Sequence, residues 1–437
     1  MWLFDQILEF FSFQDVNIRY VALGTVLLGA SSAIVGCFTF LRKKALVGDT
    51  IAHSILPGIC LSFIIFKTKD PLMLLLGAMI SGWISVYLVD YISAKSKIKP
   101  DTAIGLVLSV FFGIGILLLT YIQHSGNAAQ AGLDKFLFGK AASLVQDDVI
   151  TFGIVSILLI GTIILFFKQF SLLSFDVNFA KTIGVPVRIF EVLLSTLTVL
   201  AVAIGIQTVG VVLMAAMLIT PAAAARFWTD KLKVMIVIAS IIGAFSGLFG
   251  AFISYTAPSM PTGPWIVVVL SFIAIGSLLI APKNGAISKM KRQQKNKQKI
   301  LEDNILKLMY KLGEKENDYF KNRSITQLKN HREIPENKFL KGLKILKKKN
   351  HVAHVNDQWV LTEEGKQAGM RIVRIHRLWE LYLTTYLRIA PDHVHEDAET
   401  IEHIITPEME LKLEHLLDFP EKDPHHTEIP YKKNANE

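Results

Sequence analysis

Cysteine is rare in this sequence, and both cysteines lie in apolar segments. Cys37 and Cys60 are the only two among 437 residues. They form neither a CxxC metal motif nor a disulfide framework, because such frameworks need several pairable cysteines. We therefore interpret both as small buried hydrophobic residues.

Two motifs that would assign other functions are also missing. The opening stretch MWLFDQILEFF has no basic residue and carries Asp5 and Glu9, so it does not resemble a cleavable signal peptide. We expect the first spanning helix to direct insertion.

The chain also has no GxxxxGK[ST] phosphate-binding loop. If ATP hydrolysis drives this protein, a separate polypeptide has to carry it out, and we do not expect the chain itself to be an enzyme.

Charged side chains are scarce in the first two-thirds of the chain and abundant in the rest. Overall, 51% of the residues are hydrophobic and the mean hydropathy is +0.42. A helix needs roughly 20 apolar residues to cross a bilayer. The first 282 residues therefore predict an all-α polytopic membrane bundle of about nine transmembrane helices, at about 17–41, 45–66, 71–93, 103–123, 147–167, 187–206, 208–227, 233–256 and 264–282.

The position of the basic residues predicts the orientation in the cell membrane. Short loops rich in Lys and Arg mark the cytoplasmic side. Nine spans with the N-terminus outside and the C-terminus inside place every basic cluster on that side. The largest run, from Lys283 to Lys299, holds seven basic residues and no acidic one. We expect it to be a solvated linker that attracts anionic lipid headgroups.

An acidic residue and a histidine interrupt the second apolar run. Asp49 and His53 in ALVGDTIAHSILPG are four residues apart, so they share one face of a helix. Ionisable groups inside a span usually mark a pathway. A carboxylate and an imidazole on one face can bind Mn²⁺, Zn²⁺ or Fe²⁺. Pro57 and Gly58 follow, where they could break the helix. The alternative is that Asp49 caps the helix and His53 makes a satisfied polar contact.

The stretch FDVNFAKTIGVPV lies in a predicted cytoplasmic loop between two spans. We expect Asp176 to start a short helix, Phe179 and Ala180 to give it an apolar face, and Gly184 to end it. A short helix that projects from the membrane can dock in a groove of a partner protein. An ordinary interhelical loop is the alternative.

After residue 300 the pattern becomes that of a soluble, mostly α domain. Three helices are predicted, in EDNILKLMYKL, SITQLKNH and IPENKFLKGLKILKKKN, followed by a β-hairpin in VAHVNDQWVLTEEGK. This order is typical of a winged helix-turn-helix. A lysine-rich third helix can read DNA, although such faces are usually just solvated.

A long helix and an acidic, histidine-rich segment complete the tail. Ten of the twelve histidines lie after residue 300. Glu399, Glu402 and His403 share one helical face, and so do His376 and Glu380. Packed together, these faces would offer nitrogen and oxygen ligands suited to Mn²⁺ or Fe²⁺. The alternative is a charged, solvated helix.

Several strings in residues 17–282 resemble the ABC-3 family of metal permeases, the inner-membrane subunits of zinc, manganese and iron importers. They are FTFLRKKALVGDTIAHSILPGICLSF, IKPDTAIGLVLSVFFGIGILLL, LDKFLFG, FDVNFAKTIGVPV and QTVGVVLMAAMLITPAAAARF. The resemblance implies a transport pathway through Asp49 and His53 and a cytoplasmic ATPase docked near residues 176–188. It also implies an extracellular metal-binding lipoprotein and a second permease copy or a paralogue.

Residues 301–430 resemble the iron- and manganese-dependent repressors of the DtxR family, through RIHRLWELYL, VHEDAETIEH and DPHHTEIP. The resemblance implies a regulatory Mn²⁺ in this domain, with ligands at His376, Glu380, His395, Glu399, Glu402 and His403. Glu399 at a position where iron-type members have Cys favours manganese. Asp303 matches a further ligand, whereas a second acidic position is Leu306 here, so one of the paired sites is expected to be incomplete.

Together these patterns and resemblances predict the permease subunit of an ABC importer for a divalent metal, with a cytoplasmic metal-sensing domain. The expected metal is Mn²⁺, with Zn²⁺ or Fe²⁺ as alternatives. Tethering to a membrane argues against nucleic-acid binding. A membrane-anchored transcription regulator and an ion-driven carrier are the alternative functions. The expected domains are 1–282 (permease), 283–300 (linker), 301–367 (winged helix), 368–430 (metal-binding and dimerisation) and 431–437 (tail).

Overall fold

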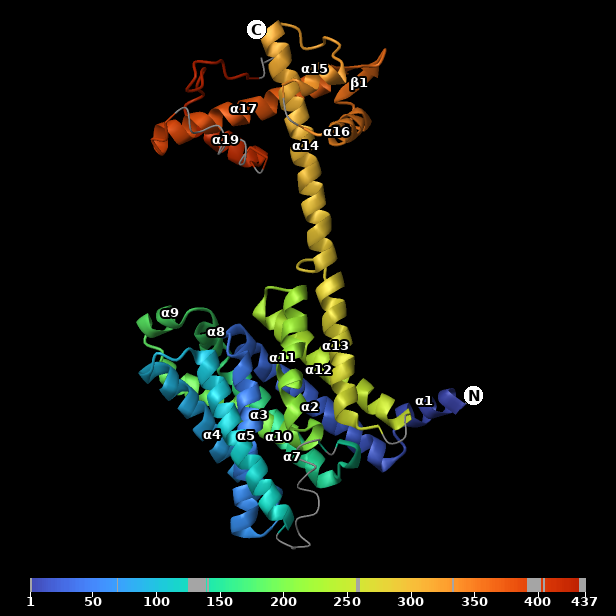
Figure 1. The fold of residues 1–437 in the computed structure, drawn as a ribbon, viewed down its shortest axis with the longest axis vertical. Helices are drawn as coiled ribbons and strands as arrows, with labels where there is room; N and C mark the ends of the chain where they lie inside the picture. The colour runs from blue at the N-terminus through green and yellow to red at the C-terminus, as the bar shows by residue number, and fades with distance from the viewer. Residues whose placement is uncertain are drawn as a thin grey trace. The chain divides into compact units, whose positions relative to one another are not determined.

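The computed structural model divides the chain into two compact units, Met1–Lys289 and Met290–Glu437 (Figure 1). The boundary between the units falls inside one long helix, α14 (Ala286–Glu316). The residues that the structure describes are 2–68, 70–124, 139, 141–256, 260–331, 334–390, 402–403 and 405–431.

Every span predicted from hydropathy is a helix in the N-terminal unit. Within the described part of this unit, eight helices are long and apolar enough to cross a membrane, and the ninth, α11, is shorter. The nine are α2 (Val16–Leu41), α3 (Ala45–Phe66), α4 (Pro71–Lys95), α5 (Pro100–His124), α7 (Gln146–Leu165), α10 (Val187–Val209), α11 (Val211–Trp228), α12 (Leu232–Thr256) and α13 (Thr262–Ile280). The polytopic all-α prediction is therefore confirmed, with the count of nine approximate.

Three further helices flank these spans. They are α1 (Trp2–Ser12), α8 (Phe167–Phe175) and α9 (Val177–Thr182), with a short 3-10 turn at Ala141–Ser143. The sequence pattern predicts α9 but neither α1 nor α8. Phe10 anchors α1 by packing its ring against Phe252 and Tyr255 of α12, so α1 is fixed by a contact with a distant part of the chain.

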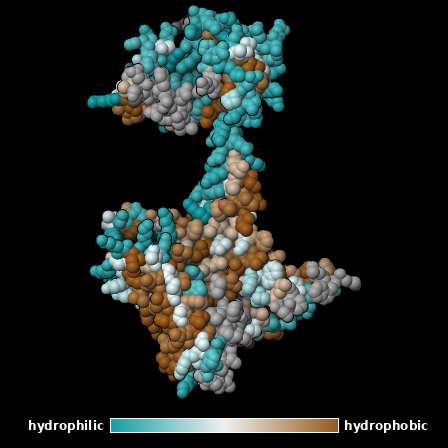
Figure 2. Space-filling model, in the orientation of Figure 1, coloured by the Kyte–Doolittle hydropathy of each residue, from teal (hydrophilic) through white to brown (hydrophobic). Residues whose placement is uncertain are grey.

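The surface of the N-terminal unit is apolar where its helices face outward (Figure 2). Large hydrophobic side chains are exposed there, including Leu117, Ile157 and Phe272. Such a surface suits a lipid environment. Inside, small residues let backbones meet: a Cβ atom at Gly29 of α2 would lie 2.3 Å from the Gly243 carbonyl oxygen of α12.

Helix α3 continues through Pro57, so the expectation that Pro57 and Gly58 break the helix is wrong. Proline is tolerated inside membrane helices because neighbouring groups satisfy the freed backbone. Gly58 has a different role. A Cβ atom there would lie 2.0 Å from the Gly77 carbonyl oxygen of α4, so glycine permits the close approach of α3 and α4.

The C-terminal unit begins with the winged-helix order that the sequence predicted. After α14 come α15 (Ile325–Lys329), α16 (Glu336–Lys348), β1 (Val352–Val355) and β2 (Gln358–Leu361). Ser324 and Gln327 form a capping box at the start of α15. The strands pair antiparallel, and Asn356 and Asp357 both adopt positive φ at the turn, the geometry that favours a two-residue hairpin.

Two helices complete the described part of this unit, α17 (Glu363–Tyr386) and α19 (Pro407–Leu416). Leu378 of α17 packs against Leu413 of α19 and Ile429. The basic segment expected as a linker is helical from Ala286 onward and exposed from Lys289 to Ile300. Lys, Arg and Gln favour helix, so solvation of their charges does not oppose this conformation.

Candidate functional site

The two ionisable residues of the second span lie beside each other on α3. Oδ1 of Asp49 is 3.6 Å from Nε2 of His53. The Asp49 side chain is 38% exposed and that of His53 is 17% exposed. The i, i+4 spacing thus brings the carboxylate and the imidazole together in a partly open environment. Asp49 does not cap α3, because the N-cap residue of this helix is Lys44.

The other surroundings of His53 leave metal-binding atoms available. Its ring packs edge-on against Phe112 of α5, with centroids 4.8 Å apart. Its Nδ1 atom is buried and makes no hydrogen bond to the described residues. Pro57 has no N–H group, so it donates no helical hydrogen bond to the His53 carbonyl. One helix turn therefore presents a carboxylate and an imidazole.

Ion pairs link the ends of several spans near the predicted basic clusters. Arg42 donates to Glu191 of α10 at 2.5 Å, and Nζ of Lys44 lies 3.3 Å from Oδ1 of Asp90 on α4. The sequence marked Arg42 and Lys44 only as basic residues. Their partners are far along the chain, so the pairs became visible only in the fold.

The predicted docking helix forms at the expected position. Asp176 caps α9, and its side chain accepts a hydrogen bond from the Phe179 N–H at 2.9 Å. Gly184 adopts φ +80° just after the helix, where glycine is favoured. Ala180 is fully buried, whereas Phe179 and Ile183 are about half exposed. Of the two residues expected to give α9 an apolar face, Ala180 therefore packs inward and Phe179 faces outward, together with Ile183.

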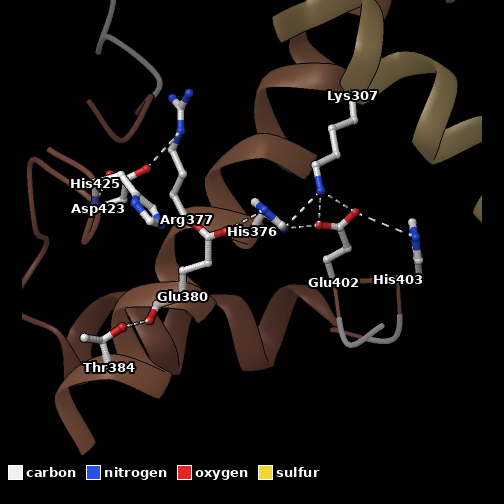
Figure 3. A network of polar contacts seen from close by, with 9 residues as sticks. All are labelled: Lys307, His376, Arg377, Glu380, Thr384, Glu402, His403, Asp423 and His425. Atoms are coloured by element: carbon white, nitrogen blue, oxygen red, sulfur yellow. Dashed lines mark hydrogen bonds and ion pairs between the residues drawn. The ribbon is translucent and has the colours of Figure 1, made fainter. Parts of the chain in front are cut away.

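Two of the predicted ligands of the C-terminal unit, His376 and Glu402, contact a lysine (Figure 3). Nζ of Lys307, on α14, donates to both carboxylate oxygens of Glu402 at 3.1 and 2.8 Å and lies 3.0 Å from Nδ1 of His376. His376 contacts Glu402 through Nδ1 at 2.6 Å and Glu380 through Nε2 at 2.8 Å. All four side chains are at most 3% exposed.

Electrostatics inside this cluster favour an ionised Glu402. Burial opposes its charge, but the hydrogen bond from His376 and the positive charge of Lys307 outweigh burial and hold the pKa of Glu402 below its ordinary value. Removing one partner from a buried ion pair typically costs about 3–5 kcal/mol. Lys307 therefore stabilises the packing of α14 against Glu402 and His376. The sequence pattern did not predict this role of Lys307.

Of the remaining predicted ligands, His403 and Asp303 contact each other, and the other two are not described by the structure. Nδ1 of His403 lies 3.0 Å from Oδ2 of Asp303, and its Nε2 lies 3.7 Å from Glu402. His395 and Glu399 lie outside the described residues. Among the residues that the structure describes, no group of three His, Cys, Asp or Glu side chains is arranged to hold a metal ion.

The position between Glu402 and His376 does not fit a divalent ion. An ion bound to Oε2 of Glu402 and Nδ1 of His376 would need the space beside both atoms that the Lys307 ammonium takes. Two cations in one buried site repel each other strongly. The predicted metal site of this domain therefore stays a prediction that depends on His395 and Glu399.

A second buried ion cluster lies next to this one on α17 (Figure 3). The Arg377 guanidinium donates to both oxygens of Glu314 at 2.9 and 2.6 Å, and its Nε lies 3.6 Å from Asp423. Burial opposes the guanidinium charge, but Glu314 and Asp423 outweigh burial and raise the pKa of Arg377 above its ordinary value. This cluster joins α14, α17 and the segment after α19.

Comparison with known proteins gives two family matches. Residues 14–281 match the model of the ABC 3 transport family, and residues 362–431 match the model described as iron dependent repressor, metal binding and dimerisation domain.

Relatives match over most of both chains. The manganese transport system membrane protein MntC of Bacillus subtilis is 42% identical over 378 residues, which is 86% of each chain. The zinc transport system membrane protein TroC of Treponema pallidum is 40% identical over 65% of this chain and 95% of its own. A solved structure, PsaBC from Streptococcus pneumoniae in complex with a Fab, matches with a TM-score of 0.58 and 34% identity, covering 64% of this chain and 97% of that chain.

Proposed function

We infer that this chain, which belongs to the ABC 3 transport family, is the membrane permease subunit of an ATP-binding-cassette importer for divalent transition metals. The relatives reported above are named as manganese and zinc transport proteins. That match favours transport over the alternative of a membrane-anchored transcription regulator.

The observation that carries this proposal is the Asp49–His53 pair. A divalent ion passing through a bilayer must exchange its water for protein ligands. Asp49 offers a carboxylate oxygen 3.6 Å from Nε2 of the His53 imidazole, so the two can share one ion. We propose that both residues bind the ion in transit, tightly enough to select it and weakly enough to release it.

We propose Mn²⁺ as the preferred substrate, with Zn²⁺ or Fe²⁺ as alternatives. Carboxylate oxygens suit Mn²⁺, whereas imidazole also suits Zn²⁺ and Fe²⁺. A mixed oxygen and nitrogen pair is therefore compatible with all three. The name of the Bacillus subtilis relative, a manganese transport protein that matches 86% of this chain, supports the order of preference.

We propose three protein partners. A cytoplasmic ATPase subunit would dock on α9, where Phe179 and Ile183 present an exposed apolar face held by the Asp176 cap and the Gly184 turn. An extracellular metal-binding lipoprotein would deliver the ion. A second permease copy or a paralogue would complete the pore.

We place the N-terminus outside the cell membrane and the C-terminus in the cytoplasm. The support is the positive-inside rule, because an odd number of spans puts Arg42, Lys44, Lys181 and the run from Lys283 to Lys299 on one side. This orientation also places α9 and the basic run, which we propose contacts anionic lipid, in the cytoplasm.

We propose that the C-terminal unit regulates transport. The permease (1–282) is followed by the basic segment (283–300). The C-terminal unit then consists of a winged-helix part (301–367), a part that matches the repressor family (368–430) and a tail (431–437). A regulatory Mn²⁺ there would need His395 and Glu399, and it would bind away from the position between Glu402 and His376 that Lys307 occupies. We do not propose that the unit binds nucleic acid.

The experiment that tests the transport proposal is uptake of radiolabelled Mn²⁺ into proteoliposomes. The chain is reconstituted with or without its ATPase partner, and with ATP or a non-hydrolysable analogue. We expect uptake only when the ATPase and ATP are both present. Equal uptake without the ATPase would identify an ion-driven carrier instead, and no uptake under any condition would contradict a transport function.

A further inference from the structure

The C-terminal unit places the ammonium of Lys307 against two of its predicted metal ligands, His376 and Glu402 (Figure 3). The Lys307 side chain enters from α14 and is 3% exposed. Its ammonium contacts both oxygens of Glu402 and lies 3.0 Å from His376. A lysine is almost never buried this deeply unless it is paired, and the contacts with Glu402 and His376 supply such pairing.

The ammonium joins elements that are far apart in the sequence. Lys307 lies on α14, His376 on α17, and Glu402 precedes α19. The carboxylate and the imidazole approach each other to 2.6 Å around it. A bound metal ion joins protein segments in the same way, because it neutralises ligands that would otherwise be buried with unpaired charge.

We propose that Lys307 replaces a metal ion at this position, so that the C-terminal unit adopts its folded arrangement without Mn²⁺ bound between Glu402 and His376. The matched family is described by metal binding, and this chain fills that place with a covalently attached positive charge. The C-terminal unit then acts as a constitutive regulatory or structural domain. Its conformation does not change with the cytoplasmic metal concentration through metal binding to Glu402 and His376.

Hydrogen–deuterium exchange of the full-length chain in detergent micelles tests this proposal. Peptides from α14 and α17 report on the cluster, while transport does not enter the measurement. The wild type is compared in EDTA and in excess MnCl₂, with Lys307→Met and Lys307→Arg as variants. Lys311→Met, at an exposed position one turn later on the same helix, is the matched control.

We expect wild type and Lys311→Met to show equal protection in EDTA and in MnCl₂. Lys307→Met should lose protection in EDTA, because Glu402 loses its cation, whereas Lys307→Arg should keep protection without Mn²⁺. If Lys307→Met does not fold, retention of metal-independent protection by Lys307→Arg still supports the proposal.

Two results would overturn it. The first is a gain of protection by the wild-type α14 and α17 peptides when Mn²⁺ is added, which would mean that metal displaces the lysine. The second is a Lys307→Met chain as protected in EDTA as the wild type. Neither result bears on uptake through the membrane unit, so the transport proposal is tested separately.

Discussion

Oδ1 of Asp49 lies 3.6 Å from Nε2 of His53, one turn further along α3. The pair sits inside a helix that is otherwise apolar, and Nδ1 of the same ring is buried without a hydrogen bond to the described residues. Polar groups are expensive in such a setting and are usually functional. This setting supports our proposal that the pair binds an ion in transit.

Changing the ligand chemistry at this pair should change the metal preference. Asp49→His would place two imidazoles one turn apart, and imidazole suits Zn²⁺ better than carboxylate does. We expect Zn²⁺ to compete more strongly against radiolabelled Mn²⁺ in uptake by this variant than in the wild type. The measurement is the half-inhibitory concentration of Zn²⁺ against radiolabelled Mn²⁺ uptake, in the variant and in the wild type. Equal values in both chains would argue that Asp49 does not contact the ion.

Removing the exposed aromatic ring of α9 should uncouple transport from ATP hydrolysis. Phe179 is 51% exposed next to the buried Ala180, so Phe179→Ala leaves the core intact while deleting the proposed anchor. We expect ATPase binding to weaken by roughly thirtyfold, since aromatic hot spots at interfaces are commonly worth about 2 kcal/mol or more. Co-purification of the ATPase and coupled uptake measure the effect.

The control for that variant is Phe272→Ala, which removes an equally large ring from the exposed surface of α13. It should leave ATPase binding and uptake unchanged. Equal loss in both variants would point to general destabilisation, and no loss in Phe179→Ala would show that the ATPase docks elsewhere.

Helix packing gives a prediction about stability. In Gly29→Ala the new Cβ atom would lie 2.3 Å from the Gly243 carbonyl oxygen, so α2 and α12 must move apart. Overpacking of this kind typically costs about 1–3 kcal/mol. We expect a lower thermal midpoint in detergent than for Gly276→Ala, where nothing lies within 4 Å of the added atom. Equal midpoints would contradict close packing at Gly29.

Local patterns in the sequence were sufficient to predict most of the fold. Long apolar runs gave the spanning helices, since length and hydropathy alone decide whether a segment crosses a bilayer. The Ser324 cap and the Asn356–Asp357 turn gave the start of α15 and the hairpin. Each of these signals lies within the segment that it predicts.

Features that depend on distant contacts could not be predicted in this way. Pro57 suggested a broken helix, but α3 is continuous in its packed surroundings. Lys307 resembled one more surface lysine of an amphipathic helix. Its partner Glu402 is 95 residues away, so only the fold shows that it occupies a predicted metal position. The Asp49–His53 pair was predictable because i, i+4 proximity is a local property.

Uptake of radiolabelled Mn²⁺ by Asp49→Asn and His53→Gln chains, reconstituted with the ATPase, tests the central claim most directly. Asp101→Asn and His124→Gln, at exposed positions on α5, serve as controls for loss of the same groups elsewhere. We predict that initial uptake falls by about tenfold or more in the first two variants, corresponding to about 1.4 kcal/mol or more, and stays at the wild-type rate in the controls. Wild-type uptake by both Asp49→Asn and His53→Gln would contradict a pathway through this pair.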